Sequence, residues 1–452
     1  MSKRTLDETS APDPAAGRTE KKSKLETHSA PVRLDVGNGH SASEADAVQA
    51  SSAFQPATIT KRRLDETSTT DPVAEPAGKK IRLDTDSPNG HAEAGSGPDI
   101  TKAEADLYDR QIRLWGLDAQ QRMRHSKILV IGVTGLSNEI CKNLVLSGVG
   151  GLTVISSDIV EESDLSVQFF LRETDIGTNL AKAVAPRIQA LNPRVQVDAL
   201  TFDVHKQPSK FFDNFDVICC CNVARYGMIR INNICRGLGK KFYAVDTAGV
   251  IGYIFCDLYT HKFVESKKSS GRNDAVKSTF QKTYKYQALE QVLESKWGML
   301  NYAALSKREK RAFNARVDPV YFAFNVLWQF EEETNGVPNA DDFERLRSVR
   351  DTFMRSVECD PAYVSDDLLR CLTKISYAHG ELAAVCAVLG GYAAQDILKV
   401  ISAKDAPFDN FFAFNGTAFS GKQLKLGKLD QVVVEINKPV KKPVETIVVA
   451  VD

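Results

Sequence analysis

The chain has 452 residues, which allows two or three domains and a sizeable core. Lysine plus arginine and aspartate plus glutamate both number 58, so net charge favours neither a specific nucleic-acid partner nor a membrane surface. The nine cysteines include no C-x-x-C pair and the seven histidines are scattered, which argues against a structural zinc site and for reduced thiols in an intracellular protein.

Residues 1–100 are predicted to be a disordered tail, because core-forming residues are rare there. Within this tail, KRTLDETSAPDP at 3–14 recurs as KRRLDETSTTDP at 61–72, and KKSKLET at 21–27 recurs as KKIRLDT at 79–85. Paired basic clusters on a flexible chain favour a nuclear import receptor as partner and a nuclear location; a solvated tail of balanced charge is the alternative. The basic residues concerned are Lys3, Arg4, Lys21, Lys22, Lys24, Lys61, Arg62, Arg63, Lys79, Lys80 and Arg82.

After a helical segment at 104–126, the stretch KILVIGVTGLSNEICKNLVLSGVGG at 127–151 predicts a strand, a glycine-containing turn and a helix, with the next strand at 152–155. This order is typical of a βαβ nucleotide-binding unit. In the usual G-x-G-x-x-G turn the second glycine admits phosphates and the third lets the helix pack on the strand. Counted from Gly132, those two positions hold Thr134 and Ser137, with Gly135 between them. The vestigial turn therefore favours a scaffold that binds no nucleotide over a nucleotide site.

Further strands are predicted within 191–200, 215–223 and 240–249, and a last extended run at 252–266. Alternating strands and helices indicate an α/β fold: a Rossmann-like, doubly wound, mostly parallel sheet with helices on both faces. The expected parts are 101–266 and 376–428 for this sheet domain, a helical insertion at 267–375 between them, and a C-terminal tail at 429–452. The apolar segment 382–394 is too short to span a bilayer, so a helix buried against the sheet is expected.

Four motifs together resemble the ubiquitin-like-protein activating enzymes: YDRQIRLWGLDAQ at 108–120, the glycine turn, AVCAVLGGYAAQDILK at 384–399 and NFFAFNG at 410–416. The resemblance implies a ThiF/MoeB-like fold in which two halves pair face to face. One half binds ATP and magnesium, adenylates the C-terminal glycine of the modifier and carries the thioester cysteine. The other half is a regulatory scaffold that supplies an arginine to the ATP phosphates, and that arginine corresponds to Arg110. Its alternative role is a surface ion pair with Asp106 or Asp109.

Departures from the pattern of the active half imply that this chain is the regulatory half. Val167 stands at the position of an arginine, Leu180 at that of a lysine, and Val223-Ala224 at that of an Asp-Asn pair. No cofactor or metal is therefore expected on this chain, while ATP and magnesium are expected on the partner.

The sequence offers no candidate for the thioester nucleophile. No cysteine lies between Cys256 and Cys359. Acidic residues flank Cys359 on both sides, and they disfavour an activated thiolate. The helical insertion thus resembles a catalytic-cysteine half-domain that lacks its thiol.

The partners that the resemblance implies are the catalytic subunit of a SUMO-activating heterodimer and SUMO itself. The interface is expected to be mostly apolar and to include Tyr108, Trp115, Val385, Val388 and Leu389. One alternative is the regulatory subunit for the ubiquitin-like modifier of cullins. Two others are a stand-alone nucleotide-dependent oxidoreductase or adenylating enzyme, which the altered turn opposes, and a purely scaffolding nuclear protein, which the arginine motif opposes.

The C-terminal tail ends in a β-branched run, Ile447, Val448, Val449 and Val451, with acidic residues at both ends. It resembles the short SUMO-interacting motifs that add as a strand to a sheet edge. The favoured interpretation is that 430–436 and 446–451 pair with a sheet of this protein or its partner, because a run this apolar usually lies within its own complex.

Overall fold

The computed structural model describes residues 100–268, 277–374, 380–427 and 430–437, all of which belong to one compact unit, Thr58–Asp452. The predictions for the basic clusters of residues 1–99 and for the apolar run 446–451 lie outside the described residues.

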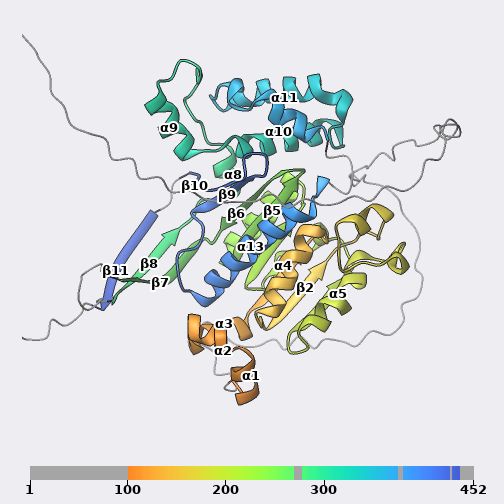
Figure 1. The fold of residues 1–452 in the computed structure, drawn as a ribbon, viewed down its shortest axis with the longest axis vertical. Helices are drawn as coiled ribbons and strands as arrows, with labels where there is room; N and C mark the ends of the chain where they lie inside the picture. The colour runs from red at the N-terminus through yellow and green to blue at the C-terminus, as the bar shows by residue number, and fades with distance from the viewer. Residues whose placement is uncertain (1–99, 269–276, 375–379, 428–429, 438–452) are drawn as a thin grey trace, which may run out of the picture. The chain divides into compact units, whose positions relative to one another are not determined.

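An eight-stranded sheet in the order β10-β9-β6-β5-β4-β1-β2-β3 forms the centre of the fold (Figure 1). Its parallel part follows the predicted apolar runs, because strands covered on both faces by helices need side chains that bury in either direction. The parallel strands are β1 (Lys127–Ile131), β2 (Gly151–Ile155), β3 (Gln196–Leu200), β4 (Val217–Cys221) and β5 (Lys241–Ala248). A doubly wound, mostly parallel sheet is thereby confirmed.

The other edge of the sheet is antiparallel. The chain reverses after β5 and returns as β6 (Ile251–Asp257). Much later in the sequence, β9 (Asn410–Asn415) pairs with β6, and β10 (Ser420–Lys425) closes a hairpin with β9. The predicted return of the sheet domain near the C-terminus therefore places β9 directly beside β6.

Helices cover both faces of this sheet, and each strand divides its apolar side chains between them. In β1, Ile128 and Val130 belong to the core beneath one set of helices, whereas Leu129 and Ile131 belong to the core on the opposite face. The first set comprises α3 (Leu117–His125), α4 (Gly135–Leu146), α5 (Leu180–Leu191) and α13 (Ala383–Ser402). The second comprises α6 (Ser209–Phe212), α7 (Arg225–Leu238), α8 (Leu289–Leu293) and α10 (Pro319–Thr334).

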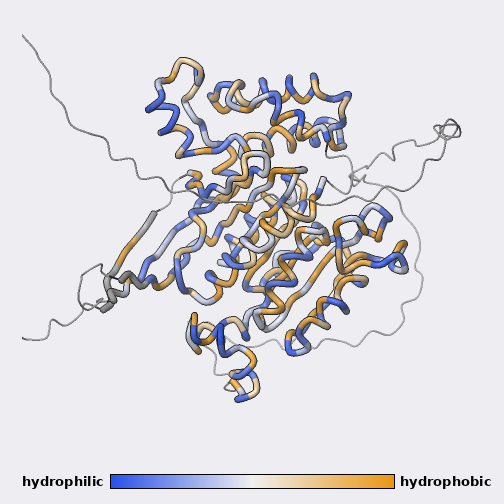
Figure 2. The backbone as a smooth tube through the Cα atoms, viewed as in Figure 1, coloured by the Kyte–Doolittle hydropathy of each residue, from blue (hydrophilic) through white to orange (hydrophobic). Residues whose placement is uncertain are grey.

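The helix α13 is long and apolar enough by composition to cross a membrane, but 56% of its most apolar window is buried inside the protein. It packs along α4 and against β5 and β6, and Figure 2 shows it hydrophobic along much of its length. The two helices approach so closely that a Cβ on Gly390 would lie 2.4 Å from the Cβ of Glu139. These contacts make α13 a core helix of the sheet domain.

Two short helices, α1 (Lys102–Leu107) and α2 (Asp109–Trp115), precede α3 and are fixed to the sheet domain by Tyr108. The Tyr108 hydroxyl accepts a hydrogen bond of 2.8 Å from Asn192 Nδ2. Gly148 makes room for the tyrosine ring, since a Cβ there would lie 2.5 Å from the ring and its φ of 76° also favours glycine. At the end of α2, Lys404 Nζ donates to the carbonyl of Trp115.

The insertion is largely helical, with α9 (Lys307–Arg316), α11 (Phe343–Ser356) and α12 (Asp366–Leu372) beside α8 and α10. A capping box begins α9: the side chain of Ser306 accepts from the N–H of Glu309, and the carboxylate of Glu309 accepts from the N–H of Ser306. The central helix α10 is buried over most of its length, and its Phe324 and Trp328 pack edge-on against Tyr253 of β6. The insertion thus forms part of the sheet's second face.

A second, three-stranded sheet corrects two of the predictions. The extended run at 252–266 is not one strand, because it divides into β6 and β7 (Thr260–Lys268), which lie in different sheets. The helical character expected for the insertion at 267–375 begins only at α8, since β8 (Lys277–Lys285) is a strand paired with β7. β11 (Asp430–Asn437) pairs with the other side of β8, so the prediction that 430–436 joins one of the protein's own sheets is confirmed.

Candidate functional site

The crevice between the ends of β1 and β4 is where a doubly wound sheet binds its ligands, because the connections leave these two strands in opposite directions. Gly132 follows β1 with a φ of 90°, and a Cβ at this position would lie 2.1 Å from the carbonyl oxygen of Cys221 at the end of β4. The first glycine of the turn is thus required by the backbone. The two positions where the usual glycines are replaced, Thr134 and Ser137, come next in the sequence.

Thr134 and Ser137 cap the helix that begins at this turn. The Thr134 hydroxyl accepts a hydrogen bond of 3.2 Å from the N–H of Ser137, and the Ser137 hydroxyl accepts one of 2.8 Å from the N–H of Thr134. Both residues are buried. The side chains that replace the glycines therefore bind backbone N–H groups that a bare turn leaves for phosphate oxygens.

Glu381, just before α13, supplies the remaining acceptors at this helix end. Its carboxylate accepts hydrogen bonds from the N–H of Gly135 at 2.7 Å and from the N–H of Leu136 at 2.9 Å. The side chain is buried, with 5% of the residue exposed. Glu381 was not among the residues predicted from the sequence, where its only signal is an acidic residue at the start of a long apolar helix.

The positions that correspond to phosphate and metal ligands of an active half hold apolar side chains. Leu180 and Val223 are buried in the two hydrophobic cores, and Val167 is half-buried beside Gly135. Ala224 precedes α7 without any side-chain capping bond. Among the residues that the structure describes, no group of three or more His, Cys, Asp or Glu side chains could hold a metal ion.

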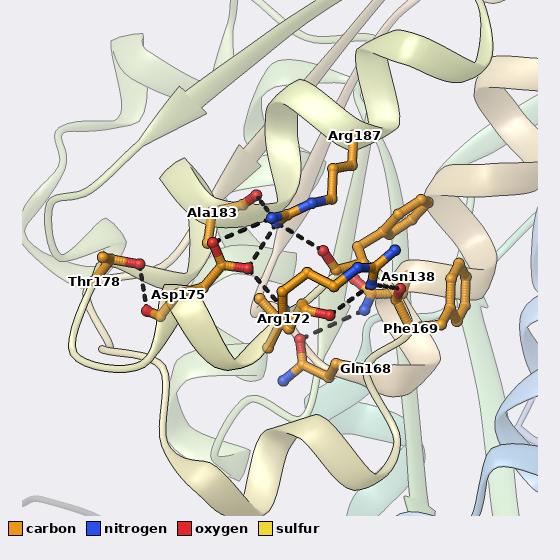
Figure 3. A network of polar contacts seen from close by, with 10 residues as sticks. Asn138, Gln168, Phe169, Arg172, Asp175, Thr178, Ala183 and Arg187 are labelled. Atoms are coloured by element: carbon orange, nitrogen blue, oxygen red, sulfur yellow. Dashed lines mark hydrogen bonds and ion pairs between the residues drawn. The ribbon is translucent and has the colours of Figure 1, made fainter.

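A polar network joins the loop that follows β2 to α5 and to the turn after β1 (Figure 3). Arg187 of α5 contacts both carboxylate oxygens of Asp175 at 2.7 and 3.2 Å and also donates to the carbonyl of Ala183. Gln168 donates to the carbonyl of Val133, within the turn, and to the carboxylate of Asp164. The loop is thereby bound to the turn by the chain's own side chains.

Arg110 lies on α2 with its side chain exposed. The neighbouring carboxylate of Asp109 pairs instead with Arg113, one turn further along, at 3.0 Å. Arg110 forms no ion pair with any residue of the described ranges. The alternative of a surface ion pair with Asp106 or Asp109 is therefore not realised among the residues that the structure describes.

The five residues predicted for the partner interface differ in their exposure. Tyr108, Val385 and Leu389 are buried within this chain, so their side chains pack in its own core. Trp115 is half-buried and Val388 is 38% exposed. Exposed apolar side chains of this region are Val388 and Tyr392 on α13, Leu382 just before that helix, and Leu114 and Leu117 near the end of α2.

No cysteine of the described ranges has the environment of an activated thiol. Cys359 is fully buried, and burial raises its pKa to about 12. The remaining cysteines are buried as well, apart from the half-buried Cys371.

The fold, the altered turn and the motifs agree with the comparison with known families. The ThiF family matches residues 108–432, and the chain belongs to this family. Among curated proteins, it is similar to SUMO-activating enzyme subunit 1 of Rattus norvegicus, with 36% identity over 348 residues, 73% of this chain and 96% of the relative. The proteins of the same name from Homo sapiens and Danio rerio are each 35% identical, over 73% and 71% of this chain and 96% and 94% of theirs. The family resemblance inferred from the four motifs is thereby confirmed.

A comparison with solved structures finds one described as a crystal structure of SeMet PaaA. The TM-score is 0.44 and the sequence identity 15%, over 75% of this chain and 78% of that chain.

Proposed function

We propose that this chain is the regulatory subunit of a heterodimeric SUMO-activating enzyme. The observation that carries the proposal is the similarity to curated SUMO-activating enzyme subunit 1 proteins, which extends over almost their whole length. The names of these relatives favour SUMO over the modifier of cullins. In this role the chain supports adenylation of the SUMO C-terminus and thioester formation on its partner.

The partner binds ATP and magnesium, and this chain binds neither. The support lies at the turn after β1, where the N-terminus of α4 is capped by side chains of the chain itself, and in the burial of Leu180 and Val223 in the two hydrophobic cores. The same observations oppose a stand-alone nucleotide-dependent enzyme. A thioester forms on the partner, since Cys359 is inaccessible here.

Arg110 is the residue that acts across the interface. Its exposed guanidinium, on a helix anchored by Tyr108 and Trp115, supplies positive charge to the phosphates of ATP on the partner. Such a charge stabilises the transition state as pyrophosphate leaves, and it needs no metal on this chain. The anchoring of α2 fixes where the arginine stands.

The partner surface includes the outer side of α13. Leu382, Val388 and Tyr392 expose apolar side chains there, and an obligate interface of roughly 2,000 Å² or more is mostly apolar. This surface replaces the buried side chains of Val385 and Leu389 as the expected contact.

Reconstitution tests the proposal directly. The full chain alone should neither bind Mg-ATP at micromolar concentration in calorimetry nor exchange pyrophosphate with ATP. Together with the catalytic subunit and SUMO it should restore ATP-dependent pyrophosphate exchange. Micromolar ATP binding by the chain alone, or exchange by the catalytic subunit that is independent of this chain, would contradict the proposed function.

The basic clusters of residues 1–99 direct the protein to the nucleus through an import receptor. A shortened protein that begins at Ile100 keeps the Thr101–Glu104 capping box of α1. It should therefore retain full activity with its partner but lose nuclear accumulation when it is expressed without that partner, as fluorescence microscopy can show. Nuclear accumulation of the shortened protein under those conditions would refute this role.

A further inference from the structure

The start of α4 already carries a negatively charged ligand, and that ligand is part of the chain. In a βαβ nucleotide-binding unit the phosphates sit where the first N–H groups of this helix point, because those groups and the helix dipole both favour an anion. Here the two carboxylate oxygens of Glu381 receive the N–H groups of Gly135 and Leu136, at 2.7 and 2.9 Å.

The other backbone N–H groups at the start of α4 also have acceptors within the chain. The N–H of Thr134 donates to the hydroxyl of Ser137, that of Ser137 to the hydroxyl of Thr134, and that of Asn138 to the carbonyl of Thr134. Together with the two bonds to Glu381, every N–H from 134 to 138 has an acceptor within the chain. The carboxylate is thus the one charged acceptor in a set of otherwise neutral ones.

We propose that Glu381 is an internal anion ligand that occupies the phosphate position of the altered turn. It closes this crevice to phosphates, and it attaches the beginning of α13 to the beginning of α4. The inference concerns this chain by itself and does not rest on the proposed function.

The second consequence follows from where Glu381 lies in the sequence. It stands two residues before Ala383, the first residue of α13, and 246 residues after Gly135. Further along, Gly390 fixes the crossing with α4 at Glu139. The carboxylate therefore holds the beginning of α13, next to the exposed Leu382 and one end of the helix that exposes Val388 and Tyr392.

Substitution with chemical rescue tests the ligand role. Glu381→Ala removes a group of the size of acetate, so the full-length variant should unfold roughly 5 °C or more below the wild type, because two charge-assisted hydrogen bonds are lost. Acetate or inorganic phosphate should restore part of this loss, by a few °C, when compared with sodium chloride at the same ionic strength. Glu309→Ala is the matched control, because Glu309 also caps a helix N-terminus but is exposed.

The comparison removes general effects of salts on stability. A gain with acetate or phosphate that is larger in Glu381→Ala than in the wild type and in Glu309→Ala supports the proposal. An equal gain in all three proteins overturns it, because the carboxylate then acts only through packing. These readings need neither the partner nor SUMO, so failure of this inference is distinguishable from failure of the proposed function.

If Glu381→Ala does not fold, Glu381→Gln decides the question. The amide has almost the same shape as the carboxylate but no charge, and it offers one acceptor oxygen in place of two. The proposal requires a lower midpoint of thermal unfolding than in the wild type. A midpoint equal to that of the wild type overturns the role of the charge.

Discussion

Replacing Arg110 by alanine in the assembled heterodimer should slow SUMO adenylation without loosening the assembly. The side chain is exposed and forms no ion pair with residues of the described ranges, so its removal should change the free energy of unfolding by less than about 0.5 kcal/mol. Its anchors, Tyr108 and Trp115, are untouched. Any loss of rate then reports on the charge itself.

The size of the effect follows from what the charge does. An arginine supplied in trans to a phosphoryl transition state can contribute about 10³-fold or more. A smaller factor, on the order of 10-fold to 100-fold, is expected here, because magnesium on the partner neutralises part of the same charge. This corresponds to about 1.4 to 2.7 kcal/mol of activation free energy.

ATP–pyrophosphate exchange by the purified heterodimer is the assay. Arg110→Lys should recover only part of the rate, because an ammonium group cannot make the two-pronged contact of a guanidinium. Arg113→Ala is the matched control: it lies on the same helix, is more than three-quarters exposed and loses only a surface pair with Asp109. Equal exchange rates for Arg110→Ala and Arg113→Ala would refute the reasoning.

Three further predictions concern stability and the thiol. Gly148→Ala places a Cβ 2.5 Å from the ring of Tyr108 and should cost about 1–3 kcal/mol in urea unfolding, whereas Gly237→Ala, with no atom within 4 Å, should gain up to about 1 kcal/mol. Burial raises the pKa of Asp396 from 3.8 to about 6, so its contribution to stability is full below about pH 4 and is lost as the pH rises through 6. The difference in unfolding free energy between the wild type and Asp396→Asn should therefore fall across that window, by up to about 3 kcal/mol; a constant difference would contradict it. Cys359→Ala should leave thioester formation by the heterodimer unchanged on non-reducing gels, and a lost thioester band would refute the structural role of this buried thiol.

The parts of the fold that could be predicted from sequence are those where burial requires a simple pattern of apolar residues. β1, β4 and β5 are short apolar runs because helices cover both their faces. β8 gave no such signal, because its sequence KSTFQKTYK mixes basic and polar residues with two aromatics. It pairs with β7, which precedes it in the sequence, and with β11, which follows the insertion. Its pairing with β11 joins residues about 150 positions apart, which periodicity within a window cannot detect.

The candidate site was also predictable only in part. The loss of two glycines indicated that the turn does not admit a phosphate, and the side chains of Thr134 and Ser137 show the physical reason in their mutual hydrogen bonds. The residue that occupies the phosphate position was not predictable, because Glu381 lies 246 residues after Gly135 in the sequence. The interface residues were harder still, since a fully apolar helix does not reveal which of its sides faces its own core.

The packing of α13 on α4 also determines how late during synthesis the fold of the sheet domain can be completed. The apolar surface of α4 is covered by α13, a helix that ends at Ser402. Arg122 of α3 donates to the carbonyl of that same residue, which lies 280 positions later in the sequence. A nascent chain that has passed the first βαβ unit therefore carries an uncovered apolar surface through the synthesis of the whole insertion. Contacts of such long sequence separation form late and slowly. Exposed apolar surface of this kind makes a partly synthesised chain prone to aggregation until nearly the whole chain has emerged.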